Sequence, residues 1–383
     1  MFQSYRPAWM TDDLLQFRDA VRRFAREQLE PNDMKWREAG QPTREAWRMA
    51  GALGMILPDV PEEYGGAGGT PAHAAVVFEE FGYSGNTALA LGVGMNHIVA
   101  HYLTRYGTEA QKQRWLPGVC SGEVVAAIAM TEPGTGSDLQ AVRTRAERRG
   151  DHYVVNGAKT FISNGQLCDV VLVVTKTDTA LGAKGISLML VDTTSPGFRR
   201  GKALDKIGME GQDTSEMFFD DCAVPADALL GGVEGQGFYQ LMNQLPYERA
   251  QLAIHAVGAM RHAFDMTVEY VKERKAFGKA IGDFQNTRFV LADVKAVLTA
   301  SCAFSDTVVQ QWIDGALDSV TASMAKFWLT ERQGEVMDKC LQLFGGYGYM
   351  KEYPIARMYA DARVQRIYGG TNEIQRELVG RSL

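Results

Sequence analysis

The chain has 383 residues, of which 46% are hydrophobic and 22% charged, and its net charge is −6. These values are typical of a globular protein whose large core is shared by two or three structural units. They argue against a nucleic-acid-binding face, because no run of Lys and Arg is long enough to follow a phosphate backbone.

Export signals and metal motifs are not found in the sequence. No apolar stretch reaches the roughly 20 residues of a membrane helix, and the first residues lack a signal-peptide pattern, so we expect a cytoplasmic protein without a membrane span. Five scattered cysteines form no C-x-x-C pair, which argues against disulfides or a zinc cluster. His97 and His101 would share one helix face, but no acidic residue has zincin spacing, so no metal site is predicted.

Residues 1–122 are predicted to form a helical domain. An amphipathic pattern covers 11–30, with Thr11 as the cap and Pro31 as the expected end. Further helix starts are indicated by Thr43, by the Thr-Pro pair at 70–71, and by a capping box at Thr108.

Residues 123–232 have a different texture, with short β-branched or aromatic runs that predict strands. These runs are 124–130, 152–157, 169–175, 185–191 and 216–221. Asn156-Gly157 and Asn164-Gly165 are interpreted as turns between strands. Because no helix-length segment separates the runs, an antiparallel, barrel-like sheet is expected rather than a doubly wound one.

Residues 233–383 return to helical periodicity and are predicted to form a four-helix bundle. The periodic segments are about 237–275, 283–312, 316–343 and 371–380. Pro246 should kink or end the first of them. The fold class is therefore α+β and mainly α, and no strand is followed by the G-x-G-x-x-G fingerprint of a Rossmann site.

Several segments could hold a flat or phosphorylated ligand. The loop AMTEPGTGSDL, at 129–139, offers hydroxyls and backbone N–H groups. In KTFISNG, at 159–165, Phe161 and Ser163 could stack on and hydrogen-bond one ring. Taken alone, an ordinary surface turn and a half-buried strand explain these two segments better.

Cations and glycines suggest a phosphate site in the last third of the chain. Arg274 and Lys275 lie near Gly278, where a flexible turn could bring them to a pyrophosphate, although a solvated helix end would look the same. The segments QLFGGYGY and YGGTNEIQ add glycine pairs that let backbone approach a ligand closely.

Together these five segments, in this order and at these separations, resemble the acyl-CoA dehydrogenase family over nearly the whole chain. The bundle half is most similar to the long-chain and isovaleryl-type members. The resemblance implies a homotetramer with one FAD per subunit, an acyl-CoA substrate, and an electron-transfer flavoprotein as the electron acceptor. The lack of a targeting signal favours a bacterial source.

The resemblance also implies roles for particular residues. Those expected to bind FAD within the chain are Ile128, Met130, Thr131, Gly136, Ser137, Phe161, Ile162, Ser163, Thr371, Asn372 and Glu373. Phe161 stands where many relatives have tryptophan. Those expected to bind the FAD of a neighbouring subunit are Arg274, Phe277, Gln285, Gln342, Phe344, Gly345 and Gly346. Those expected at the substrate are Ser137, Tyr239, Tyr247, Arg249, Gly369 and Gly370.

The catalytic base is displaced from its common position. Many family members carry it in a YEGT motif, but this chain has YGGT, with Gly369 in place of the glutamate. Long-chain and isovaleryl-type relatives carry the base before an arginine on the first bundle helix, and Glu248-Arg249 matches that position. An arbitrary Glu-Arg pair would be a surface salt bridge, but the missing glutamate favours Glu248 as the base.

The expected reaction is α,β-dehydrogenation of an acyl thioester. Glu248 would take the α-proton, flavin N5 the β-hydride, and the Gly369 N–H would hold the thioester oxygen. Without a side chain at 369 the pocket should be wider, which favours medium, long or branched acyl groups. An acyl-carrier-protein dehydrogenase or an acyl-CoA oxidase on the same fold is the alternative, and a non-catalytic acyl- or partner-binding subunit is the alternative from another class.

Overall fold

The computed structural model describes residues 5–383, and its first part is helical as predicted. The helices are α1 (Asp12–Phe24), α2 (Asp33–Ala39), α3 (Arg44–Ala52), α4 (Pro71–Tyr83), α5 (Leu89–Tyr106) and α6 (Glu109–Ser121). The Thr43 hydroxyl accepts the Ala46 N–H at the start of α3, and the capping box at Thr108 is present. These polar starts satisfy N–H groups that a helix end leaves without partners.

Pro31 does not end the first helical segment, so that prediction is wrong. After α1 the chain continues through a π turn, Ala25–Leu29, and a 3-10 turn, Glu30–Asn32, directly into α2. Pro31 stands in the first turn of the 3-10 segment, where its missing N–H leaves no hydrogen bond unmade. The real end is Gly40, whose φ of 74° is the left-handed conformation of a helix C-terminus.

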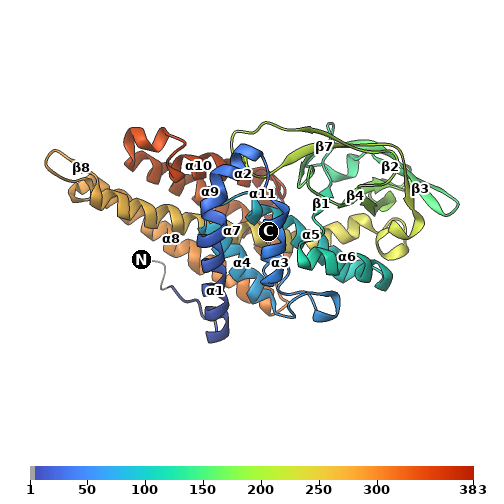
Figure 1. The fold of residues 1–383 in the computed structure, drawn as a ribbon, viewed down its shortest axis with the longest axis horizontal. Helices are drawn as coiled ribbons and strands as arrows, with labels where there is room; N and C mark the ends of the chain where they lie inside the picture. The colour runs from blue at the N-terminus through green and yellow to red at the C-terminus, as the bar shows by residue number, and fades with distance from the viewer. Residues whose placement is uncertain (1–4) are drawn as a thin grey trace.

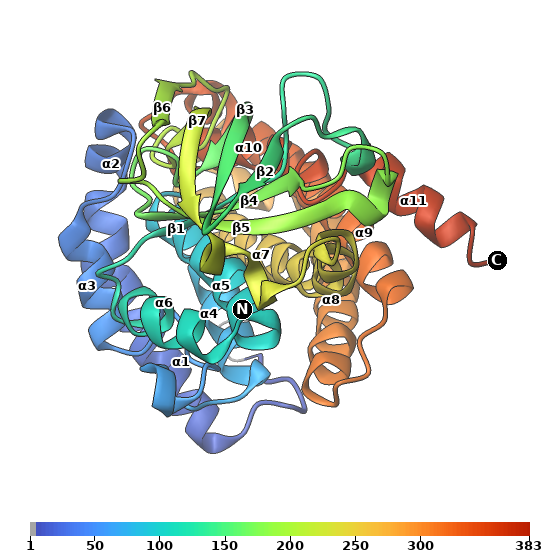
Figure 2. The same ribbon diagram turned by 90° about the vertical axis from the view of Figure 1, so that its right-hand side faces the viewer.

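The middle of the chain forms one seven-stranded sheet, which curls as predicted (Figure 2). Its strands are β1 (Ala126–Ala129), β2 (Arg145–Arg149), β3 (His152–Ser163), β4 (Val170–Lys176), β5 (Ile186–Asp192), β6 (Phe198–Ala203) and β7 (Thr214–Pro225). Most pairs are antiparallel, but β4 runs parallel to β1 and β2. The sequence did not indicate β2 and β6, because RAERR and FRRGKA lack the apolar alternation of a half-buried strand.

Asn156-Gly157 is not a turn, which corrects the sequence prediction. Both residues lie inside β3, where the pairing register with β7 shifts between Val155 and Gly157. Gly157 has a φ of 153°, and a Cβ there would meet the Thr144 hydroxyl at 2.4 Å. The glycine therefore marks a bulge with close backbone packing. Asn164-Gly165 does follow β3 as a turn.

The last third of the chain contains the long helices α7 (Gly237–Glu273), α8 (Gln285–Ile313) and α9 (Ser319–Leu343), followed by α10 (Pro354–Ala362) and α11 (Asn372–Gly380). Pro246 lies inside α7 without interrupting it, so the expected boundary there is absent. A short hairpin of β8 (Lys275–Ala276) and β9 (Lys279–Ala280) joins α7 to α8.

The helices and the sheet form one elongated body (Figure 1). The sheet occupies one end, the β8–β9 hairpin the other, and α4 packs along α7 between them. Helix α5 contacts both β1 and α7, so it joins the sheet to the bundle. Within residues 5–383 no helix is both long and apolar enough to cross a membrane.

Candidate active site

Glu248 is buried on α7 and faces α5. The residue is 6% exposed, and its Oε1 accepts a hydrogen bond of 3.0 Å from the Tyr102 hydroxyl. Burial raises the pKa of Glu248 from 4.5 to about 7, against the opposing effects of the Tyr102 hydrogen bond and the Arg249 charge. A carboxylate with this pKa can accept a proton near neutral pH.

Arg249 is also buried, but it points to another helix. Its Nη1 donates to the hydroxyls of Ser319 and Ser323 on α9, at 3.3 and 3.1 Å. Glu248 and Arg249 are therefore not a solvated surface salt bridge. Because the guanidinium is held on α9, it opposes the pKa shift of Glu248 without reversing it.

Gly369 and Gly370 form a tight loop ahead of α11. Their φ values are 64° and 84°, the left-handed region that favours glycine. Gln375 Nε2 donates to both of their carbonyls, at 3.2 and 3.1 Å. Within residues 5–383 the Gly369 N–H makes no hydrogen bond, so it is free to donate to a ligand.

Leu252 occupies the space beside Gly369. A Cβ at 369 would come within 2.5 Å of Leu252 Cδ1, and Leu252 lies one turn after Glu248 on α7. The wider pocket at position 369 stays a prediction, and the space that a side chain at 369 would need is occupied by Leu252 of α7.

Lys326 also holds the Gly369-Gly370 loop in place. Its buried ammonium donates to the Gly370 carbonyl at 2.8 Å and to Asn372 Oδ1 at 2.9 Å. Burial, with a smaller contribution from Arg249, lowers the pKa of Lys326 to about 7. The Asn372 side chain is thus committed to contacts inside the protein, whereas Thr371 caps α11 by accepting the Ile374 N–H.

The two segments expected at the flavin ring are held side by side. The Thr131 carbonyl accepts the Thr160 N–H at 3.0 Å, and Lys159 donates to the Met130 carbonyl at 3.0 Å. Lys159 also pairs at 2.9 Å with Glu132, a buried carboxylate that accepts two backbone N–H groups of the next segment. This buried pair pins the 129–139 loop onto β3.

Phe161 is an exposed residue of β3, the strand that holds the 129–139 loop. It is 67% exposed, and its φ of 60° falls where the pairing of β3 with β7 is irregular. A left-handed conformation is costly for a bulky residue, and it tends to persist where function requires it. Ser163 follows two residues later and is half-buried, while Ile162 between them is buried.

Helix α5 connects strands β1 and β3 of the sheet to Glu248. Asn164 at the end of β3 donates to the Gly92 carbonyl of α5 at 3.1 Å. Asn96 accepts the Ala126 N–H of β1 at 2.8 Å, and the same helix carries Tyr102. One helix therefore contacts both the sheet segment and Glu248, which are more than eighty residues apart in sequence.

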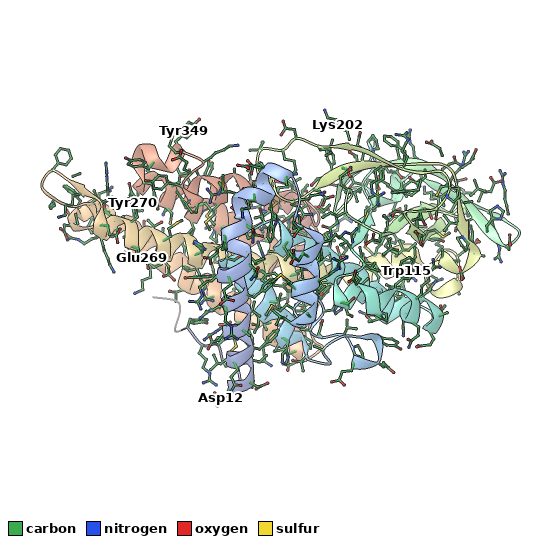
Figure 3. The ribbon with its side chains drawn as sticks, in the orientation of Figure 1. Asp12, Trp115, Lys202, Glu269, Tyr270 and Tyr349 are labelled. Atoms are coloured by element: carbon green, nitrogen blue, oxygen red, sulfur yellow. The ribbon has the colours of Figure 1, made fainter. Side chains whose placement is uncertain are left out.

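A second group of expected residues lies at the other end of α7. Arg274, Phe344, Gly345 and Gly346 line a hollow of about 460 Å³, with the Arg274 guanidinium 5.3 Å from the Tyr347 ring centre. Tyr270 and Tyr349 mark this end, far from Trp115 and the sheet (Figure 3). Arg274 follows Glu248 by 26 residues, which is about 39 Å along a helix, so the two belong to different sites of one chain.

The remaining expected residues differ in exposure. Tyr247 is buried next to Glu248, whereas Tyr239, on the same helix, is 62% exposed. The exposed residues also include Gly136, Ser137, Phe277, Gln285, Gln342 and Glu373, while Ile128 and Met130 are half-buried. The sequence missed Tyr102, Leu252 and Lys326, because no motif marks contacts between residues so far apart.

Comparison with known proteins covers the whole chain. Three domain families match it: acyl-CoA dehydrogenase, N-terminal domain, over residues 11–123; middle domain, over 127–222; and C-terminal domain, over 235–383. The mitochondrial long-chain specific acyl-CoA dehydrogenase of Mus musculus is 46% identical over 96% of this chain and 85% of its own. Isovaleryl-CoA dehydrogenase of Oryza sativa is 36% identical over 96% and 90%.

The fold is also similar to that of a solved acyl-CoA dehydrogenase. The crystal structure of an acyl-CoA dehydrogenase from Geobacillus kaustophilus superimposes with a TM-score of 0.95 at 42% identity, covering 98% of this chain and 99% of that one.

Proposed function

The chain belongs to the acyl-CoA dehydrogenase family, and on this premise we propose that it is an α,β-dehydrogenase whose base is Glu248. The observation that carries the proposal is the buried carboxylate of Glu248, bonded to Tyr102 and with its pKa raised to about 7. The family consists of FAD-dependent oxidoreductases. The proposed substrate is a medium-chain, long-chain or branched acyl-CoA.

The residues of this chain suit FAD. An exposed aromatic face at Phe161, a neighbouring hydroxyl at Ser163 and the pinned 129–139 loop offer a stacking surface with polar edges. When bound, FAD supplies the acceptor for the hydride that leaves the substrate β-carbon. We also propose a homotetramer, in which the Arg274 hollow would hold the pyrophosphate end of the FAD of a neighbouring subunit.

Glu248 performs the proton transfer in this proposal. With a pKa of about 7, the carboxylate is largely ionised slightly above neutral pH and is still basic enough to take a proton from the α-carbon. Tyr102 orients it through one hydrogen bond and leaves its other oxygen available. Both groups are buried, so the carboxylate is not hydrated as it would be at the surface.

The Gly369 N–H stabilises the developing charge on the thioester oxygen. Gln375 and Lys326 bind the carbonyls of the same loop and so fix the direction of its free N–H group. A preorganised donor of this kind lowers the barrier because it need not reorient during the reaction. Electrons would then pass to an electron-transfer flavoprotein.

Anaerobic flavin bleaching tests the assignment. We expect Glu248→Gln to retain FAD and acyl-CoA while bleaching slows by about 10²–10⁴-fold, because the amide cannot accept the proton. A wild-type bleaching rate in this variant would contradict the proposal. A panel of acyl groups tests the substrate: bleaching only by acyl-carrier thioesters, or rapid reoxidation in air, would reassign the enzyme within the family, and failure to take up FAD would indicate a non-catalytic protein.

A further inference from the structure

A cluster of three ligand-type side chains lies beside the proposed base. His97 and His101 are one turn apart on α5, and Asp59 reaches them from the loop after α3. Each residue offers one potential ligand atom, and these three atoms lie within 4.8 Å of one another. We refer to these three residues as the Asp59 cluster. Sequence spacing could not reveal it, because Asp59 precedes His97 by 38 residues.

The Asp59 cluster is buried and incompletely satisfied. The side chains of Asp59, His97 and His101 are 3%, 0% and 22% exposed. Asp59 Oδ1 and the Nε2 atoms of both histidines have no hydrogen-bond partner within residues 5–383. His101 Nε2 lies 3.0 Å from Asp59 Oδ2, within ion-pair distance. A bound ion would give these buried atoms a partner and offset the cost of burying them unpaired.

The side chains of the Asp59 cluster have the ligand chemistry of a site for a divalent transition-metal ion. Two imidazoles and one carboxylate are ligands that Zn²⁺ and similar first-row ions prefer. Asp59 Oδ2 lies 3.0 Å from His101 Nε2, Asp59 Oδ1 lies 3.9 Å from His97 Nδ1, and one ligand atom of each residue lies within 4.8 Å of the other two. We propose that Asp59, His97 and His101 bind one divalent transition-metal ion.

Neighbouring aromatic groups orient the histidines. The Tyr247 hydroxyl lies 3.0 Å from His97 Nδ1, and the Tyr247 ring stacks on His101 with centres 4.2 Å apart. Since Tyr247 precedes Glu248 on α7, the ion ties the Asp59 loop and α5 to the helix that carries the base. Its role is structural, because the proposed proton and hydride transfers do not require it.

Metal binding by the FAD-loaded full-length protein tests the proposal. Protein stripped with a chelator is titrated with Zn²⁺, and bound zinc is measured by mass spectrometry alongside the Tm. We expect one zinc per chain and a rise in Tm, because an ion that binds only the folded state stabilises it. Asp59→Asn and His101→Gln should each weaken binding by about 10–100-fold or more. His152→Gln is the matched control, since His152 pairs with Asp151 at 3.1 Å on the surface.

Three results would overturn the proposal: no zinc uptake with an unchanged Tm, wild-type affinity in both cluster variants, or an equal loss of affinity in His152→Gln. FAD content and circular dichroism of each variant identify misfolding, and the second cluster variant replaces one that misfolds. A cluster that takes up no ion, but whose variants selectively slow bleaching by hydroxylated acyl-CoA, would instead bind a polar acyl group and overturn the metal assignment.

Discussion

The two ends of α7 carry different halves of the proposed chemistry. At one end Glu248 is buried and bonded to Tyr102, and the loop of Gly369 is anchored from two sides. At the other end Arg274 opens into an exposed hollow among glycines and tyrosines. The first site is assembled within one chain, whereas the second has a cation and two glycines exposed at the surface. This difference implies that variants of the two ends should fail in different ways.

The variant Arg274→Ala tests the Arg274 end of α7 separately from the Glu248 end. We expect its FAD dissociation constant to rise by roughly 10–150-fold, because hydrogen bonds to a charged group contribute about 1.5–3 kcal/mol. The bleaching rate at saturating FAD should match wild type. Arg149→Ala, which removes an exposed arginine of the sheet that pairs with Glu147 at 3.2 Å, is the control. Unchanged FAD affinity in Arg274→Ala, measured by equilibrium dialysis, would remove the hollow from the cofactor site.

The base end can be challenged by returning the carboxylate to position 369. Glu248→Gln with Gly369→Glu should stay inactive, since the new side chain meets Leu252. Adding Leu252→Ala should restore bleaching about tenfold over Glu248→Gln, within the 10²–10⁴-fold worth of a general base. The left-handed backbone at 369 keeps the recovery partial. Leu252→Ala alone serves as the control, and equal rates with and without it would show that Leu252 is not the obstacle.

Tyr102→Phe sharpens the same comparison through pH. The hydroxyl stabilises the ionised carboxylate, so its removal should move the pKa of Glu248 further above 7. The rising limb of kcat/KM against pH should shift upward by up to about one unit, and the rate at pH 7 should fall several-fold. FAD affinity should stay unchanged. A profile that shifts to lower pH would contradict the hydrogen bond to the ionised form.

The smallest expected effect concerns stability. The folded-state pKa of Glu248, about 7, lies above its unfolded value near 4.5, so the unfolded state binds fewer protons between these values. Stability of the wild type should therefore fall as pH rises from 4.5 to 7 and then level off. Glu248→Gln lacks this loss, so its Tm should exceed that of wild type by a few degrees above pH 7 and match it below pH 4.5. A constant difference across this range would contradict the raised pKa.

The sequence by itself determined most of the architecture. Apolar periodicity, capping residues and β-branched runs act over a few residues, so the long helices and five strands could be predicted from them. Prediction from sequence failed where a local signal was misleading. Pro31 is accommodated in a 3-10 turn and Asn156-Gly157 forms a bulge, whereas the charged strand β6 pairs with β7 despite its composition. The proposal that Glu248 is the base could be made from YGGT and Glu248-Arg249, because the absence of a glutamate at position 369 is visible in the sequence.

Only the tertiary structure decided the environment of these residues. The pKa of Glu248 depends on burial and on a hydroxyl from α5, 146 residues away, and the space at Gly369 depends on Leu252 of another helix. The same holds for Asp59 and the two histidines, which become neighbours only when a loop packs against α5. Helix and strand propensities are local, whereas desolvation, excluded volume and ligand convergence are set by packing between distant segments.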